Sequence, residues 1–211
     1  MRAWSMWMRW PAASPRQSPI ACSRCRWRPM RKIAALLAVL AAGPAAATGL
    51  EIEIAGEANG RVVIDLNEAV APGHAARLAA LAEAGAYDGV VFHRVIEGFM
   101  AQTGDVQFGR AGGDTSRAGM GGSDMPDLAA EFSDIPFVRG TVGMARSANP
   151  NSANSQFFIM FAPAPHLNGQ YTVVGQVTEG MEIVDAIRRG TGRNGAVTGT
   201  PDRMVAVRVI E

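Results

Sequence analysis

The sequence predicts a mainly β domain, either a barrel or a sandwich, that carries helices at its ends. Seven or eight short runs with strand-like patterning are separated by glycine-rich turns, and only two stretches have helical periodicity. Many short strands with few helices are typical of packed or closed antiparallel sheets. From residue 48 onward we find no internal repeat and no linker, so we expect one domain there.

Two strands and a helix are expected at the start of this domain. Alternating apolar and polar residues predict strands at 50–54 and 61–66. An apolar stripe then predicts a helix over 72–84, with Pro72 at its first position and Gly85 ending it.

The later strands are expected on both sides of a long loop, and they fall at 90–96, 100–103, 141–145, 156–160, 172–177 and 204–210. The loop, residues 105–127, is rich in Gly, Asp and Ser and is longer than usual for a compact domain. We therefore expect it to be functional or locally packed. A second helix is expected at 181–189, between Gly180 and Gly190.

The charge of the chain is unevenly distributed. The formal net charge is +1, but no Asp or Glu precedes Glu51, and eight of the 20 Lys and Arg residues lie in residues 1–47. From Thr48 onward, 12 basic residues stand against 19 acidic ones, a net charge of −7. An acidic body argues against binding to nucleic acid or to an anionic membrane surface.

Residues 30–47 have the pattern of a secretory signal peptide. A basic start at Arg31 and Lys32 precedes an apolar run at 33–40 and the small residues 45–47. The run is too short to span a membrane; the alternatives are a buried helix or an uncleaved anchor. We expect cleavage near Ala47, export to the periplasm and no membrane attachment afterwards. If the signal is not used, the protein stays in the cytoplasm.

Residues 1–29 contain all four tryptophans and both cysteines but no hydrophobic period. We interpret them as a disordered extension from a mis-assigned translation start, with Met30 as the initiator. Cys22 and Cys25 have the spacing of a redox or zinc motif, but no second ligand pair accompanies them.

Several common kinds of catalytic and cofactor site are absent from the sequence. His74, His93 and His166 lack metal-ligand spacing, and the glycines of 112–122 do not open a helix after a strand as a dinucleotide loop does. Ser123 lacks the glycines of a nucleophile elbow. We therefore expect no metal and no cofactor, and either binding or catalysis without covalent chemistry.

The hairpin over residues 90–103 carries the first positive indication of a site. If residues 97–99 form the turn, Arg94 lies opposite Gln102, and Ile96 lies opposite Met100. Strand alternation then places Arg94, Gln102 and Met100 on one face. This pattern fits a guanidinium oriented by an amide beside an apolar pocket. It also fits an exposed arginine on a strand.

Three longer motifs distinguish these alternatives. Residues 87–105 include Phe-His-Arg followed by Gly-Phe-Met-Ala-Gln-Thr-Gly-Asp and resemble the cyclophilin signature. Residues 143–159 resemble the second signature of that family, and residues 166–175 match a third stretch. The resemblance covers residues 50–211. It implies a closed eight-stranded antiparallel β-barrel capped by two α-helices, which acts as a peptidyl-prolyl cis/trans isomerase on proline-containing polypeptides. We expect a monomer.

The resemblance also implies roles for individual residues. By motif position, Arg94 resembles the catalytic arginine and Gln102 its orienting partner. The positions of the family's proline pocket are occupied by Phe99, Met100, Phe158 and Leu167. The peptide groove corresponds to Ala145, Arg146 and Gln156, with Arg146 contributing mainly its backbone. The motif assigns Phe157 to the core.

Two positions depart from the commonest eukaryotic pattern of the family. His166 stands where those proteins carry a tryptophan, and Tyr171 stands where they carry a histidine. A smaller and more polar ring at residue 166 should still cover a proline edge, and we expect weak cyclosporin binding.

Two other classes of function remain open at this point. The same fold could serve as a non-catalytic peptide-binding or chaperone module, or as a scaffold that uses its acidic face. The intact set of Arg94, Phe99, Met100, Gln102 and Phe158 favours the isomerase, because a binder has little reason to keep it.

Overall fold

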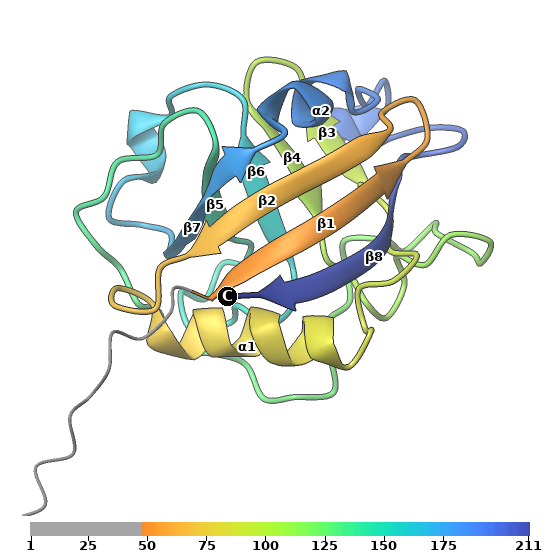
Figure 1. Cartoon of the computed structure of the whole chain (residues 1–211). Helices are drawn as coiled ribbons and strands as arrows, with labels where there is room; N and C mark the ends of the chain where they lie inside the picture. Colours follow the sequence, from red (N-terminus) through yellow and green to blue (C-terminus); the bar gives the residue numbers. More distant parts are fainter. Residues whose placement is uncertain (1–47) are drawn as a thin grey trace, which may run out of the picture. The chain divides into compact units, whose positions relative to one another are not determined.

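The computed structural model describes residues 48–211, and they contain one eight-stranded sheet whose neighbouring strands are all antiparallel (Figure 1). The predicted extension at 1–29 and the signal peptide at 30–47 lie outside the described residues. The strand order is β3-β4-β6-β5-β7-β2-β1-β8. The strands are β1 (Gly49–Ala55), β2 (Gly60–Leu66), β3 (Arg94–Ile96), β4 (Met100–Thr103), β5 (Thr141–Met144), β6 (Phe157–Met160), β7 (Val173–Glu179) and β8 (Arg203–Ile210).

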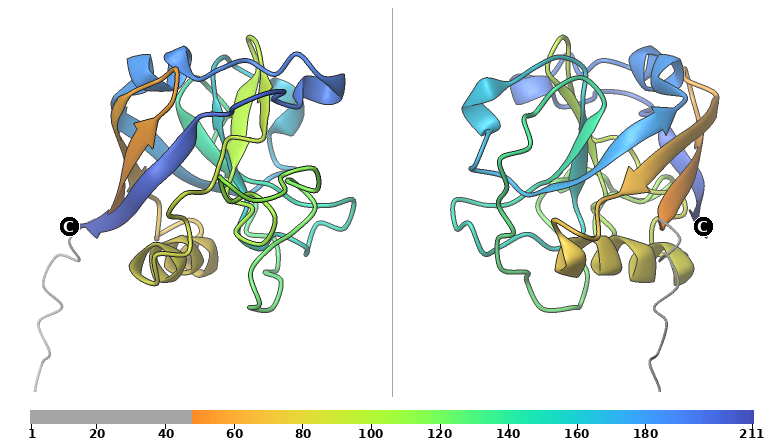
Figure 2. Two further views of the ribbon diagram at one scale, coloured as in Figure 1. Left: turned by 90° about the vertical axis from the view of Figure 1, so that its right-hand side faces the viewer. Right: turned by 60° about the vertical axis from the view of Figure 1, so that its left-hand side comes forward.

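Two α-helices lie at opposite ends of the curved sheet, as the views in Figure 1 and Figure 2 agree. Helix α1 (Pro72–Glu83) packs against β1, β7 and β8, whereas α2 (Met181–Ala186) packs against β2. Two 3-10 turns complete the set, η1 (Pro165–Leu167) and η2 (Arg193–Gly195). Within residues 48–211, no helix has the length and apolar character needed to cross a membrane.

The alternation seen in the sequence explains how β1 and β2 pair. Leu50 and Ile52 of β1 are buried, and their partners across the ladder are Ile64 and Val62 of β2, which are buried too. Burial of each such side chain contributes about 1.5–3 kcal/mol. The register is fixed because a slip by one residue would expose the whole row.

The prediction of a closed barrel is wrong, because the sheet is open. Strands β3 and β8 are its two edges and share no ladder. One isolated bridge, from Val91 to Arg203, links β8 to the segment that precedes β3. That segment divides its hydrogen bonds: the Val91 N–H donates to the Gly109 carbonyl (2.8 Å) and the Val91 carbonyl accepts the Thr103 hydroxyl (3.0 Å). On its other side, the Met204 N–H donates to the Val90 carbonyl (2.8 Å) and the Phe92 N–H donates to the Asp202 carbonyl (2.8 Å). The segment is paired over only these few residues, and the predicted continuous strand over 90–96 does not form.

Helix α2 is also shorter than the predicted 181–189. It ends at Ala186, and Ile187 has extended backbone angles. The Arg188 N–H donates to Oδ2 of Asp202 (2.6 Å), so a buried carboxylate takes the donor that a longer helix would use. Sequence periodicity could not reveal that the Asp202 carboxylate would accept this N–H group.

The loop over residues 105–127 is locally packed around one buried carboxylate. Oδ1 of Asp105 accepts the backbone N–H groups of Gln107 (3.1 Å) and Phe108 (2.9 Å). Oδ2 accepts those of Gly119 (2.7 Å) and Gly121 (2.9 Å). The carboxylate of Asp105 thus holds both the start and the far side of the loop.

Buried apolar residues form two clusters. The larger cluster fills the concave side of the sheet and includes Phe157, whose ring meets Tyr87 edge-on (5.8 Å between centroids). The smaller cluster lies on the other face of β4 and β6 and consists of Met100, Phe137, Phe158, Met160, Ala164, Leu167 and Val173. Adjacent residues of β6 therefore serve different clusters, as strand alternation requires.

Candidate active site

The β3–β4 hairpin positions Arg94 and Gln102. The observed register pairs Arg94 with Gln102 and Ile96 with Met100, as the turn chemistry predicted. The turn needs a left-handed residue, and Gly98 supplies it with φ of +67°. The Phe99 N–H closes the turn on the Ile96 carbonyl (3.0 Å).

The Arg94 guanidinium is held at two points. Its Nε donates to the Asn194 carbonyl (2.9 Å), and one terminal nitrogen donates to Oε1 of Gln102 (3.1 Å). Burial lowers the pKa of Arg94 from its ordinary value. An arginine begins so far above neutrality that the group remains a cation.

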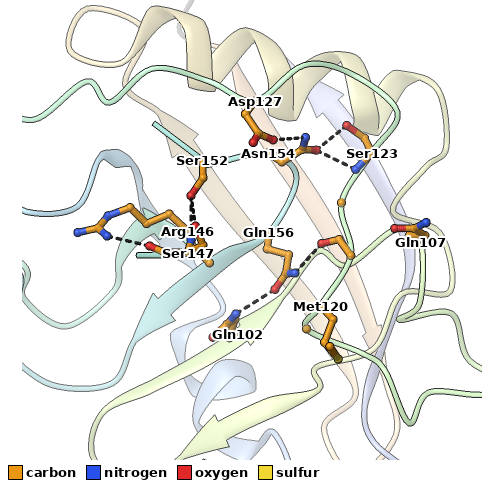
Figure 3. A pocket seen from close by; sticks show the side chains of 14 residues that line it. Gln102, Gln107, Met120, Ser123, Asp127, Arg146, Ser147, Ser152, Asn154 and Gln156 are labelled. Atoms are coloured by element: carbon orange, nitrogen blue, oxygen red, sulfur yellow. Dashed lines mark hydrogen bonds between the residues drawn. The ribbon is translucent and has the colours of Figure 1, made fainter. Parts of the chain in front are cut away.

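The amide of Gln102 is held in turn by the amide of Gln156. Nε2 of Gln102 donates to Oε1 of Gln156 (2.9 Å), and Nε2 of Gln156 donates to the Gly121 carbonyl (2.7 Å), as the dashed lines of Figure 3 mark. Three side chains, from β3, from β4 and from the residue that precedes β6, thus form one connected polar row.

Beside this row lies a cavity of about 450 Å³. Its lining includes ten of the eleven site residues predicted from the sequence: Arg94, Phe99, Met100, Gln102, Ala145, Arg146, Phe158, His166, Leu167 and Tyr171. The eleventh, Gln156, lines an adjoining cavity of about 600 Å³ (Figure 3). Gln102, Ala145 and Arg146 line both, so the two cavities meet at these residues.

Aromatic rings form much of the wall of the smaller cavity. Phe158 stacks on Phe137 with 5.8 Å between ring centroids and meets Tyr171 edge-on at 5.9 Å. Phe99 stacks on His166 at 5.7 Å. These contacts hold the rings against one another, so this wall is largely apolar and preformed.

Arg146 is a second cation in the lining of the cavity. Its guanidinium lies 4.3 Å from the centre of the Tyr171 ring and donates to the Gln170 carbonyl (2.9 Å). A terminal nitrogen also donates to the Ser147 carbonyl (2.9 Å). Its side chain is therefore engaged with the protein itself.

The other two histidines lie outside the cavities. His93 precedes Arg94 and is buried, and burial lowers its pKa to about 4. His74 is buried in α1, where its Nδ1 contacts Oε2 of Glu131 (2.6 Å).

Sequence reasoning missed two backbone groups of the site, the Asn194 carbonyl and the Gly121 carbonyl. Asn194 lies 100 residues beyond Arg94 and is the one non-glycine residue of the described chain with positive φ (55°). The Asn-Gly pair at 194–195 signals a tight turn. No pattern in the sequence indicates which side chain such a turn meets.

Comparison with known proteins shows the family to which this chain belongs. The family model described as cyclophilin type peptidyl-prolyl cis-trans isomerase matches residues 50–209. A "Probable peptidyl-prolyl cis-trans isomerase" of Brucella suis is 61% identical over 150 residues, which are 70% of this chain and 76% of the relative. A peptidyl-prolyl cis-trans isomerase of Arabidopsis thaliana is 40% identical over 135 residues, covering 64% of this chain and 77% of that one.

Solved structures show the same fold. A cyclophilin type peptidyl-prolyl cis-trans isomerase of Cryptosporidium parvum superposes with a TM-score of 0.67 at 23% identity, covering 79% of this chain and 99% of that one. A second structure of that protein, in the presence of the dipeptide Ala-Pro, gives a TM-score of 0.64 at 23% identity, with 77% and 99% covered.

The fold and site together define an open β-sheet domain with an arginine-edged apolar cavity on its outer face. The chain belongs to the family of cyclophilin-type peptidyl-prolyl cis-trans isomerases, as its sequence motifs predicted.

Proposed function

We propose that this protein accelerates rotation about X–Pro peptide bonds in polypeptides, with Arg94 as the catalytic residue. The observation that carries the proposal is the position of Arg94: its guanidinium is anchored by Gln102 at the edge of a cavity that Phe99 and Phe158 line. A proline ring in that cavity would bring its amide nitrogen within reach of the guanidinium.

The proposed chemistry breaks no bond. Rotation of a peptide bond has a barrier of roughly 18–20 kcal/mol, because the C–N bond has partial double-bond character. In the twisted transition state the prolyl nitrogen becomes pyramidal and can accept a hydrogen bond, which the planar amide nitrogen cannot. An N–H of Arg94 aimed there would bind the transition state selectively.

The reduction in the rotation barrier that this proposal requires matches the interaction energies that such a site can supply. Uncatalysed exchange takes tens to hundreds of seconds, so a turnover of about 10–10³ s⁻¹ requires lowering the barrier by about 4–7 kcal/mol. A charge-assisted hydrogen bond supplies about 1.5–3 kcal/mol, and more where water is excluded. Fixing the proline ring against Phe99, Met100, Phe158 and Leu167 while the acyl side rotates would supply the rest.

Proline-containing segments of unfolded or folding chains are the substrates we propose. The Ala-Pro dipeptide in the structure of the Cryptosporidium parvum relative supports this class. In this chain, the second cavity adjoins the first at Gln102, Ala145 and Arg146, which leaves room for residues next to the proline.

The test is an exchange NMR measurement on a proline peptide, with Arg94→Ala and Arg94→Lys as paired variants. We expect both to fold and both to lose at least about tenfold in kcat, because lysine keeps the charge but not the planar fork that serves Gln102 and substrate together. Wild-type turnover in Arg94→Ala would exclude this role. Peptide binding without any turnover in the unmodified protein would instead support a binding module.

We also propose that the protein is exported to the periplasm. The proposal rests on the sequence of residues 30–47, whose basic start, apolar run and small residues are typical of a cleaved signal. N-terminal sequencing of the protein purified from its native cells should give a start near Thr48. A start at Met1 or Met30 would contradict export with cleavage.

A further inference from the structure

The carboxylate of Asp105 is buried but lines neither cavity. Asp105 is 0% exposed, and within the described residues no basic side chain lies within ion-pair distance of it. Its charge is instead compensated by the four backbone N–H groups that converge on its two oxygens. A buried charge is tolerated only with such hydrogen bonds, so this group holds its surroundings in one arrangement.

A series of hydrogen bonds runs from Arg94 to the Gly121 carbonyl, and the backbone of Gly121 is bonded in turn to this carboxylate. The guanidinium donates to Gln102 (3.1 Å), Gln102 donates to Gln156 (2.9 Å), and Gln156 donates to the Gly121 carbonyl (2.7 Å). The Gly121 N–H then donates to Oδ2 of Asp105 (2.9 Å). Figure 3 shows the middle of this series, where Gln102 and Gln156 point toward each other.

The two ends give the series a direction. A guanidinium can only donate hydrogen bonds and a backbone carbonyl oxygen can only accept them. Gln102 must therefore turn its oxygen toward Arg94, and Gln156 must turn its nitrogen toward the Gly121 carbonyl. Hydrogen bonds aligned in one direction polarise one another, so the bonds between Arg94 and the Gly121 carbonyl strengthen one another. The Gly121 N–H belongs to the preceding peptide unit, so Asp105 acts on this series by fixing the position of the Gly121 backbone.

Gly121 is the link between the carboxylate and the amides, and it is closely packed. A Cβ on Gly121 would lie 2.6 Å from Oδ1 of Asp105 and 2.7 Å from the Phe108 ring. The N–H of Gly119, two residues earlier, is held by the same carboxylate oxygen. The direction of the Gly121 carbonyl therefore depends on the carboxylate of Asp105.

We propose that Asp105 is a positioning residue for Arg94. Its buried carboxylate fixes the backbone of Gly121, whose carbonyl ends the one-directional hydrogen-bond series that keeps the guanidinium at the edge of the proline cavity. The proposal rests on the catalytic role proposed above for Arg94. Without the carboxylate, the Gly121 carbonyl is free to turn, Gln156 loses its acceptor, and Gln102 no longer holds the guanidinium against the Asn194 carbonyl.

Asp105→Asn tests this role, and the chain offers a matched control in Asp202→Asn. Asp202 is also buried (1% exposed) and accepts the backbone N–H groups of Ala58 (2.9 Å) and Arg188 (2.6 Å), but it lines neither cavity. Each asparagine preserves shape but sets its own N–H against backbone N–H groups, so both variants lose stability. Kinetics are therefore measured where circular dichroism shows each variant folded.

The expected result separates kcat from KM. For a short proline peptide, Asp105→Asn should lower kcat about tenfold and change KM less than twofold. The residues that Oδ2 of the carboxylate holds, Gly119 and Gly121, line the second cavity and not the proline cavity, whose walls remain while the guanidinium shifts. Asp202→Asn should leave both within twofold. In NMR spectra, the side-chain amide signals of Gln102 and Gln156 and the Nε–H signal of Arg94 should shift in the first variant only. Equal losses in the two variants would show a stability effect and overturn the proposal.

Gln156→Met provides a second test, which leaves the carboxylate and its four N–H donors in place. It cuts the series between Gln102 and Gly121, so kcat should again fall about tenfold. The double variant Asp105→Asn/Gln156→Met should lose no more than the worse single variant, because both act through one series. Full kcat in Gln156→Met would refute the role even if Asp105→Asn failed to fold. An inactive unmodified protein would instead contradict the proposed function itself.

Discussion

The imidazole of His166 lies over the ring of Phe99, with 5.7 Å between the ring centroids and 28° between the planes. His166 is exposed and Phe99 is half-buried, so this stack forms a rim of the cavity that solvent reaches. A ligand that covers the rim would contact the imidazole directly.

His166→Trp should therefore tighten cyclosporin binding by about tenfold or more, since an indole adds apolar area and an N–H donor, and tenfold is about 1.4 kcal/mol. Isothermal titration calorimetry measures the change. His166→Phe serves as the control, because it adds a larger apolar ring without the donor and should give a smaller gain. The kcat for a short proline peptide should stay within about twofold in both variants. Unchanged cyclosporin affinity in His166→Trp would contradict the expectation that a bound ligand contacts residue 166 at this rim.

Phe158→Ala should raise the KM for a proline peptide by about tenfold or more, because it removes a ring that lines the cavity. Phe157→Ala is the matched control: its ring is equally buried but belongs to the larger cluster with Tyr87. Both variants should lose about 3–5 kcal/mol of unfolding free energy. Chemical denaturation measures the stability, and exchange NMR measures KM. A KM that rises equally in both variants would contradict direct contact between the Phe158 ring and the proline.

The stability of the protein should fall as the pH drops from about 6.5 toward 4. Burial lowers the pKa of His93 to about 4 in the folded protein, against 6.5 for the unfolded chain. In this window the unfolded state binds more protons, so unfolding becomes easier as protons are added. The contribution is fully present above pH 6.5 and amounts to about 3 kcal/mol, lost progressively toward pH 4.

His93→Gln cannot titrate and should flatten this part of the pH profile, as urea denaturation at pH 7, 5.5 and 4.5 would reveal. Carboxylates titrate in both proteins and cancel in the comparison. Identical slopes for the variant and the unmodified protein would mean that His93 is not the group responsible.

Gly180→Ala should destabilise the protein more than Gly89→Ala. Both glycines have left-handed φ, +80° and +77°, so alanine costs each about 1–2 kcal/mol in backbone strain. A Cβ on Gly180 would also lie 2.1 Å from the Arg61 carbonyl oxygen, whereas nothing lies within 4 Å of one on Gly89. The difference in melting temperature between the two variants measures this close approach between α2 and β2. Equal losses would show that the backbone adjusts to remove the contact.

Local patterns were sufficient to predict much of the fold. The alternation in β1 and β2 predicted which side chains are buried, and Gly98 predicted the turn that pairs Arg94 with Gln102. These elements were predictable because the forces that define them act within a few residues. The open edge between β3 and β8 was not, since it depends on how far residues distant in the sequence stay paired: the segment before β3 forms backbone hydrogen bonds with residues 202–204 only through Gly89, Val90 and Phe92.

The residues of the site were likewise predictable only in part. Motif position alone distinguished Phe158 from Phe157, because burial does not: the two rings are 5% and 1% exposed. The Asn194 and Gly121 carbonyls could not be predicted, since a backbone oxygen leaves no trace in the residue type. Asp105 carried a visible signal, a carboxylate at the start of a glycine-rich loop, but its four donors depend on how that loop folds.

The bond between Arg94 and the Asn194 carbonyl ties the hairpin to a turn near the other end of the chain. An insertion or deletion in the turn that contains η2 would therefore rotate or release the guanidinium without altering any residue of the cavity wall. Given the catalytic role proposed for Arg94, length variation there would change the isomerisation rate between relatives whose proline cavities are identical.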